Sequence, residues 1–272
     1  MVDGYVPKTL EEALLIRQSE QVIPYGGGTD LMVEPERQKA YLFLHRVAEL
    51  AQITRDETYL RLGAGCTFTQ VLEHPLTPLI LKEAIRRVAA PAIRNLGTLG
   101  GNIGNGSAKA DSVLIFFVLD AKLRLQSADG ERVVPIQSFY KGRKALDLAR
   151  DELIVEILLP RTVPEYYVYQ KVGARAALAI SRLSFAGLWQ IENGKISALA
   201  TAFGAVDQVV IRRPEIDAIL IGTPVAALDS VKTRYLEAYS GEINPIDGRI
   251  SARYRKMVCM NLLADFLKQL SL

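Results

Sequence analysis

Two short glycine clusters constrain the fold of this chain more than any other feature of its sequence. Eight of the 20 glycines stand in them: Gly26, Gly27 and Gly28, and then Gly97, Gly100, Gly101, Gly104 and Gly106. Glycine accepts positive φ angles and lets a backbone approach a ligand closely, and successive exposed N–H groups in such a turn form a concave site for an anion. A lone GGG is better explained as a tight turn between strands. The pair of clusters instead indicates two loops that could hold the two phosphates of a dinucleotide.

Two familiar phosphate-binding motifs are missing from these clusters. No GxGxxG opens a helix and no GxxxxGK[ST] occurs in the sequence. The chain therefore supports neither a Rossmann dinucleotide fold nor a P-loop nucleotide hydrolase.

Composition narrows the class of protein further. A chain of 272 residues with 49% hydrophobic and 23% charged residues has room for one large domain or two ordinary ones, and it excludes disorder and simple repeat arrays. The formal charge of +3, from 33 basic and 30 acidic residues, is too balanced for a nucleic-acid-binding protein, in which basic residues concentrate in a stripe. Small-molecule or protein partners are therefore expected.

The cysteines and histidines limit the metal chemistry of the chain. Cys66 and Cys259 are far apart in the sequence, so they form neither a disulfide framework nor a Cys₄ zinc or iron–sulfur site. His45 and His74 have no metal-ligand spacing and no paired carboxylate. We predict no metal site, and any iron–sulfur cluster that serves this chain must come from another polypeptide.

The apolar segments predict a cytoplasmic protein without a membrane span. Charges interrupt the N-terminal region where a secretory signal needs a continuous apolar stretch, and the longest apolar run, residues 113–119, is far shorter than a membrane span. In a reducing compartment both cysteines are expected to be small, partly buried hydrophobic residues and not reactive thiols.

The first half of the chain mixes short helices and strands. Thr9 and Glu12 resemble a capping box and predict a short helix from Leu10. A strand over 21–25 runs into the first glycine turn, and the alternation at 59–67 predicts a half-buried strand. A helix containing residues 79–89 follows, closed by Pro91.

The second half is strands followed by helices. Residues 113–119 form a helix or a buried segment, Asp129-Gly130 turns a hairpin, and 152–160 is a strand ended by Pro160. A boundary is expected in RTVPEYY, residues 161–167, and then strands with an Asn193-Gly194 hairpin precede mostly helical segments from about residue 212. This is an α+β arrangement, because the strand–helix alternation of a doubly wound sheet is absent.

The glycine clusters and their neighbours resemble a known family. IPYGGGTDL at 23–31 and RNLGTLGGNIGNGSAKADS at 94–112 closely resemble the two FAD-binding loops of the flavoprotein subunit of molybdenum hydroxylases, the xanthine dehydrogenase and carbon monoxide dehydrogenase family. Residues 139–160, 167–181 and 243–256 resemble further segments of that subunit in the same order. The resemblance covers nearly the whole chain.

The resemblance implies a fold, a cofactor and its contacts. It implies an FAD-binding domain of PCMH type over 1–162, with two α+β subdomains at about 1–54 and 55–162, and a smaller C-terminal α+β domain over 166–272. The flavoprotein carries no catalytic acid or base, since the cofactor performs the chemistry. The residues that the resemblance places at FAD are Pro24, Tyr25, Gly26, Gly27, Gly28, Thr29, Asp30, Leu31, Val88, Thr98, Leu99, Gly100, Gly101, Asn102, Asp111, Ile154 and Lys171.

Several of these residues also have a purely structural explanation. Thr29 and Asp30 could close a turn through side-chain hydrogen bonds, and Asp111 could be a helix N-cap. Ile154 could be ordinary strand core, and Lys171 could be a surface lysine. Ala108 and Ala145 depart from the proline and threonine of several relatives, which affects local loop shape.

The resemblance also implies a role in electron transfer. A molybdopterin-binding partner subunit would oxidise the substrate, a [2Fe–2S] subunit would carry the electrons, and the FAD of this chain would pass them to NAD or another acceptor. Two alternatives remain open, a free-standing FAD-dependent oxidase and a nucleotide-binding module without redox chemistry. A yellow protein would exclude the module, and co-purification with iron–sulfur and molybdenum chains would exclude the free-standing oxidase.

Overall fold

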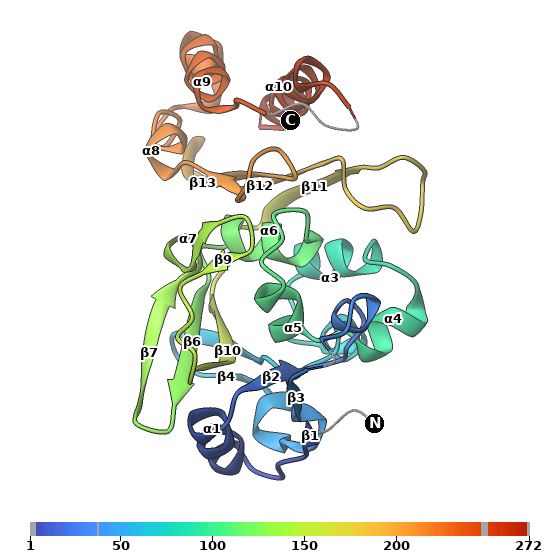
Figure 1. Cartoon of the computed structure of the whole chain (residues 1–272). Coiled ribbons are helices and arrows are strands. Elements are labelled where there is room, and N and C mark those ends of the chain that lie inside the picture. The colour runs from blue at the N-terminus through green and yellow to red at the C-terminus, as the bar shows by residue number, and fades with distance from the viewer. Residues whose placement is uncertain (1–3, 37, 246–249, 271–272) are drawn as a thin grey trace. The chain divides into compact units, whose positions relative to one another are not determined.

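The computed structural model describes residues 4–36, 38–245 and 250–270 (Figure 1). The chain divides into two compact units: residues 1–107 with 120–161 form the first, and residues 108–119 with 162–272 form the second. The mixed helices and strands confirm the α+β class. The expected domain limits, 1–162 and 166–272, stay predictions, and the structure adds that residues 108–119 group with the second unit.

A small parallel sheet begins the first unit. Its strands lie in the order β1 (Gly4–Tyr5), β3 (Ala40–Phe43) and β2 (Val22–Tyr25), and both pairings are parallel. Helix α1 (Leu10–Ser19) has the predicted cap, because Glu12 N donates to Thr9 Oγ1 at 3.2 Å. Its Ala13 and Leu14 are buried in one cluster with residues of β2 and β3. The short 3₁₀ turns η1 (Leu31–Val33), η2 (Leu44–Arg46) and η3 (Ala48–Ala51) connect these elements.

A larger antiparallel sheet follows in the same unit. Its strands lie in the order β4 (Ile53–Arg55), β5 (Tyr59–Gly63), β10 (Leu153–Pro160), β6 (Lys122–Ser127) and β7 (Gly130–Pro135). The β6–β7 hairpin confirms the predicted turn at Asp129-Gly130. Strand β10 is central and ends at Pro160 as predicted, and its nearly continuous apolar sequence reflects burial along most of its length.

Short helices complete the first unit, and one prediction about them is wrong. They are α2 (Phe68–Glu73), α3 (Leu79–Arg86), α4 (Pro91–Leu96), α5 (Leu99–Gly104) and α7 (Ile136–Phe139), with the small ribbon β8 (Tyr140–Gly142) and β9 (Ala145–Leu146) after them. Pro91 does not close the helix before it, which already ends at Arg86, but begins α4. Proline suits that first helical position because its missing N–H has no partner there in any case.

The second unit is built on an antiparallel sheet of four strands in sequence order. They are β11 (Tyr166–Val172), β12 (Leu183–Glu192), β13 (Lys195–Gly204) and β14 (Ile211–Arg212). The predicted β12–β13 hairpin is confirmed, and Asn193 and Gly194 have φ angles of 52° and 72°, the pattern that a two-residue hairpin turn requires. Helix α6 (Asp111–Val118) is buried throughout and packs on β12 and β13.

Helices dominate the last part of the chain, as predicted. They are α8 (Pro214–Asp217), η4 (Val225–Ala227), α9 (Leu228–Glu242) and α10 (Ala252–Gln269). Trp189 and Phe185 of β12 contact Phe266 of α10 edge-on, which anchors that helix on the sheet. Residues 246–249 of the closing segment lie outside the described residues. Among the described residues, none of the helices has the length and apolar character needed to cross a membrane.

Candidate functional site

The two glycine loops lie against each other in the first unit. The first loop directly follows the carboxyl end of β2. A Cβ at Gly27 would lie 1.7 Å from the carbonyl oxygen of Leu96, and a Cβ at Gly26 would lie 2.4 Å from Thr98 Oγ1. Gly28 has a φ of +68°, which L residues rarely adopt. Gly26 and Gly27 are therefore required for the contact with the second loop, and Gly28 for the backbone conformation of the first.

The second loop begins helix α5, and its amides are already hydrogen-bonded. Leu99 N donates to the carbonyl of Cys66 at 3.0 Å, and Gly100 N donates to the carbonyl of Ala64 at 2.7 Å. Gly101 N donates to Thr98 Oγ1 at 3.1 Å, so Thr98 caps the helix. We expected this loop to bind a ligand chiefly through backbone N–H groups. The amides of Leu99 and Gly100 instead hold the loop on the turn after β5, and the amide of Gly101 bonds to Thr98 within the loop.

Free backbone donors are found in the first loop instead. The amides of Gly27, Gly28 and Thr29 donate to no acceptor among the described residues. Asp30 makes no side-chain cap to η1, so it does not close the turn in that way. Buried amides nearly always have partners, and this half-buried loop presents three in succession without one. Such a row suits the phosphate oxygens of a dinucleotide.

The turn at Ala64 connects the second loop to β10. Ala64 N donates to the carbonyl of Val155 at 2.9 Å, while its own carbonyl accepts from Gly100. Ile154, the neighbouring residue of β10, is buried and pairs with Leu125 at an irregularity of the strand register. Ile154 therefore belongs to the core of its strand. Its neighbour Val155 accepts the hydrogen bond from Ala64, the residue that in turn binds the second loop.

Val88 lies in the turn between α3 and α4. Its N–H donates to the carbonyl of Ile85 at 3.0 Å, and its own carbonyl accepts from Arg94 Nη1 at 2.7 Å. Arg94 also donates to Ala89, which has a positive φ of 40°. This turn is fixed by a guanidinium from the following helix.

Asp111 and Lys171 form a buried ion pair in the second unit. Lys171 Nζ donates to Asp111 Oδ2 at 2.7 Å, and the two side chains are 9% and 8% exposed. Asp111 Oδ1 accepts from Tyr169 Oη at 3.0 Å and from Ser181 Oγ at 2.7 Å. Asp111 is the first residue of α6 and Ala110 is the N-cap, so the N-cap alternative is wrong. Lys171 is not a surface lysine.

Sequence reasoning missed Tyr169 and Ser181. Tyr169 and Lys171 are two residues apart on β11, so they share one face of the strand, and the alternation of YVYQKV carries that signal. Ser181 stands in a loop and has no comparable signal. The carbonyls of Ala64 and Cys66 were also missed, because any residue offers a carbonyl.

The two cysteines and two histidines do not belong to a cluster of metal-ligand side chains among the described residues. Cys66 and Cys259 are free and buried, and burial raises the pKa of their thiols to about 11 and about 12. Both therefore stay protonated and behave as small hydrophobic residues, as predicted. His74 Nδ1 accepts from Leu76 N at 3.3 Å at the end of α2. Across the described residues, no three His, Cys, Asp or Glu side chains gather as a metal site.

Two family descriptions together match nearly all of the chain. Residues 1–162 match the FAD binding domain in molybdopterin dehydrogenase, and residues 168–270 match the CO dehydrogenase flavoprotein C-terminal domain. The xanthine dehydrogenase FAD-binding subunit of Escherichia coli O157:H7 is 35% identical over 215 residues, which cover 75% of this chain and 74% of that protein. The nicotinate dehydrogenase FAD-subunit of Eubacterium barkeri is 29% identical over 287 residues, which cover 98% and 96%.

Solved structures share the fold over the whole length. Quinoline 2-oxidoreductase from Pseudomonas putida 86 superposes with a TM-score of 0.89 at 21% identity, covering 100% of this chain and 97% of that chain. Carbon monoxide dehydrogenase from Hydrogenophaga pseudoflava superposes with a TM-score of 0.89 at 21% identity, covering 97% and 95%.

Proposed function

Because the chain belongs to the family of FAD-binding subunits of xanthine dehydrogenase-type molybdenum hydroxylases, we propose that its FAD takes electrons from [2Fe–2S] centres of a partner subunit and passes them to NAD or another acceptor. The chain is an oxidoreductase subunit, and its cofactor is FAD. The observation that carries the proposal is the pair of packed glycine loops, with three successive amides free to bind an anion.

The residues of this chain bind and orient the cofactor. FAD supplies the redox chemistry when bound, so the protein needs no catalytic acid or base. The amides of Gly27 to Thr29 would hold the pyrophosphate, while Thr98 to Asn102 would keep that loop in position. Val88, Ile154, Asp111 and Lys171 are proposed as flavin contacts from the family pattern. The buried carboxylate of Asp111 would fix the position of the Lys171 ammonium.

The small number of cysteines in this chain supports the proposal of separate partner subunits. An iron–sulfur cluster needs several cysteine thiolates, and the two cysteines here are protonated and buried. Related proteins include the carbon monoxide dehydrogenase medium chain of Hydrogenophaga pseudoflava and the nicotine 6-hydroxylase medium subunit of Paenarthrobacter nicotinovorans. We propose separate [2Fe–2S] and molybdopterin-binding subunits for this chain, in the cytoplasm, where free cysteines stay reduced.

Purification of the tagged chain from cells that produce it tests the proposal. We expect a yellow complex that contains flavin, iron and molybdenum. If NAD is the acceptor, NADH should bleach the blue absorption band of the flavin under anaerobic conditions. If a quinone or oxygen is the acceptor, adding a quinone analogue or oxygen to the reduced complex should restore that band.

Two results would contradict the proposal. A yellow protein without iron and molybdenum that reduces oxygen by itself would favour a free-standing oxidase. A colourless full-length complex that binds nucleotides and does not take up added FAD would favour a nucleotide-binding module.

A further inference from the structure

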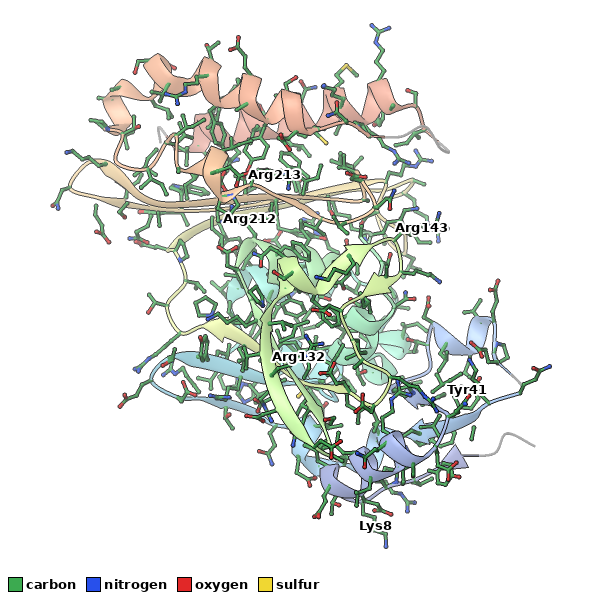
Figure 2. The ribbon with its side chains drawn as sticks, turned by 60° about the vertical axis from the view of Figure 1, so that its left-hand side comes forward. Lys8, Tyr41, Arg132, Arg143, Arg212 and Arg213 are labelled. Carbon is green, nitrogen blue, oxygen red and sulfur yellow. The ribbon has the colours of Figure 1, made fainter. Side chains whose placement is uncertain are left out.

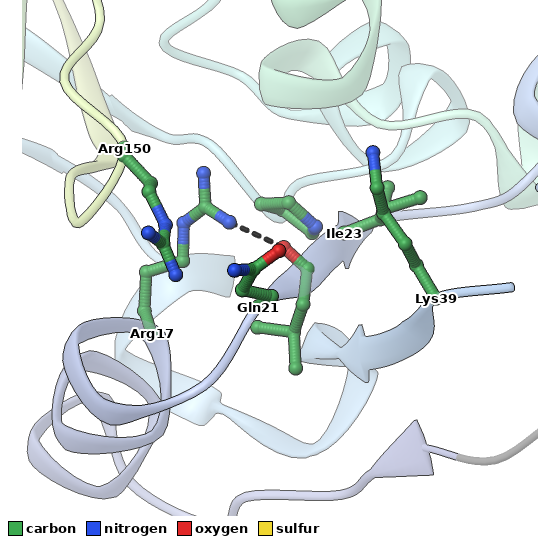
Figure 3. Close-up of a pocket in the computed structure, with 7 residues that line it drawn as sticks. Arg17, Gln21, Ile23, Lys39 and Arg150 are labelled. Carbon is green, nitrogen blue, oxygen red and sulfur yellow. Dashed lines mark hydrogen bonds between the residues drawn. The ribbon is translucent and has the colours of Figure 1, made fainter.

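A cationic cavity lies at the amino ends of β2 and β3. Its volume is about 430 Å³, within the range of small-molecule pockets. Arg17 of α1, Lys39 before β3 and Arg150 before β10 line it, together with Gln21 and apolar residues of β2. In Figure 3 the side chains of Arg17 and Arg150 both stand to the left of Gln21, and that of Lys39 stands to its right. Three cationic side chains from three segments thus line the cavity, and no acidic residue is among the described residues that line it.

Arg17 is held in place at the lining of this cavity. Its Nη1 donates to the carbonyl of Val22, which fixes the guanidinium at the start of β2. Its Nε is buried and has no hydrogen-bond partner.

The charges around the cavity are only partly compensated. Burial lowers the pKa of Arg17, and the charge of Arg150 lowers it further, while Asp151 acts in the opposite direction. Lys39 pairs with Glu36 at 2.9 Å, but both side chains are about half exposed, so this pair is weak. Arg150 forms no ion pair among the described residues. An anion between Arg17 and Arg150 would relieve their mutual repulsion.

We propose that this cavity binds a small anion that carries a phosphate group. Guanidinium groups match phosphate oxygens in pairs of parallel hydrogen bonds, and an added ammonium supplies a point charge. The cavity has room for a free phosphate or for a phosphate with a sugar attached.

The described lining of this cavity contains none of the glycines of the two loops. Strands β2 and β3 are parallel, so Gln21 and Lys39 lie at their amino ends, while the first glycine loop follows the carboxyl end of β2. Pro24 is the one residue common to the described lining of the cavity and the predicted FAD contacts. The anion is therefore a second ligand and not the pyrophosphate of FAD.

Calorimetric titration of the full-length, FAD-loaded protein tests the proposal, with inorganic phosphate, AMP and adenosine as probes at an ionic strength fixed with sodium chloride. We expect phosphate and AMP to bind and to compete, and adenosine not to bind. Tighter binding of AMP would identify a nucleotide as the ligand, and equal binding would identify free phosphate.

Substitutions locate the binding. Arg150→Ala, at an exposed position, should weaken phosphate binding about tenfold, the usual scale for one lost charged contact. Arg17→Lys keeps the charge but loses the paired geometry, and should weaken it similarly. Arg55→Ala, an exposed arginine on β4 away from the cavity lining, is the matched control and should change nothing.

Three results would overturn the proposal. The first is that neither phosphate nor AMP binds to the unaltered protein. The second is that the Arg150→Ala and Arg55→Ala proteins bind phosphate with equal affinity. The third is that the Arg150→Ala protein loses its FAD. Loss of FAD would make the cavity part of the flavin site, but would leave the proposed electron-transfer function intact.

Discussion

The contact between the two glycine loops leaves no room for a Cβ atom at Gly27. At Gly27 a methyl group would overlap the backbone of Leu96 and Gly97, which has no flexible end that can move away. Gly27→Ala should therefore lose bound FAD and lower the free energy of unfolding by about 3 kcal/mol, the upper part of the range for overpacking. Flavin absorbance per protein and urea denaturation measure the two effects.

Gly104→Ala is the matched control for this substitution. Gly104 also belongs to a glycine cluster, but nothing lies within 4 Å of the added Cβ. It lies in helix α5, where alanine is favoured over glycine by about 0.5–1 kcal/mol, so this variant should keep its FAD and gain slight stability. Equal FAD retention in both variants would contradict the loop contact.

The Asp111–Lys171 pair makes a second prediction at the scale of residues. Lys171→Met leaves the buried carboxylate without its cation, and breaking a buried pair in this way costs about 3–5 kcal/mol. Adding Asp111→Asn removes the charge and keeps an oxygen that accepts from Tyr169 and Ser181, so the double variant should recover much of the loss. Urea denaturation of both variants checks this, and equal instability of the two would contradict it.

At the scale of elements, one carboxylate joins β7 to the turn before β10. Arg132 of β7, labelled in Figure 2, donates to both oxygens of Glu152 at 2.7 and 2.8 Å, and Ala149 N donates to the same group at 2.8 Å. The Arg132 hydrogen bonds, then the Ala149 amide, hold the pKa of Glu152 below its ordinary value of 4.5, against the opposing effect of burial. This stabilisation is present above pH 4.5 and is lost as the pH falls through that value toward the lower pKa of the folded protein.

Glu152→Gln should therefore flatten the acid side of the stability curve. At neutral pH we expect a loss of about 1 kcal/mol, a small value because Arg132 is 38% exposed and solvent screens the pair. Below pH 4.5 the difference from the unaltered protein should shrink. Melting temperatures across this range measure it, with Glu57→Gln, at an exposed position in the turn between β4 and β5, as control. A constant difference at every pH would contradict the assignment.

Elements with local signals were predictable, and elements fixed by tertiary contacts were not. Turn residues such as Asp129-Gly130 and Asn193-Gly194 determine their hairpins by their own backbone preferences. Arg212, labelled in Figure 2, and Asp217 had no such signal, yet both are buried and Arg212 donates to the Asp217 carboxylate. The same carboxylate also accepts hydrogen bonds from the hydroxyl groups of Thr201, Tyr235 and Tyr239. Their burial depends on strands and helices that are distant in the sequence. The same holds for Ser181 beside Asp111.

At the scale of the whole molecule, each unit contributes a different feature to the proposed cofactor site. The free amides belong to the first unit, while the second has a buried aromatic cluster and the Asp111–Lys171 pair. The glycine clusters indicated the two loops of the first unit from sequence alone, since glycine is needed where the backbone of one loop approaches the other. The use of the α5 amides could not be predicted, because it depends on carbonyls of the turn after β5.

The proposal that the iron–sulfur clusters belong to a partner subunit leads to the last prediction. A [2Fe–2S] cluster needs about four thiolate or imidazole ligands, and this chain has two protonated cysteines and two histidines without a gathered ligand set among the described residues. The full chain produced without partners and supplied with FAD should therefore contain flavin but no stoichiometric iron, and its spectrum after reduction should lack iron–sulfur signals. The complex purified with its partners serves as the positive control. Stoichiometric iron in the isolated chain would show that its electrons need not arrive from another polypeptide.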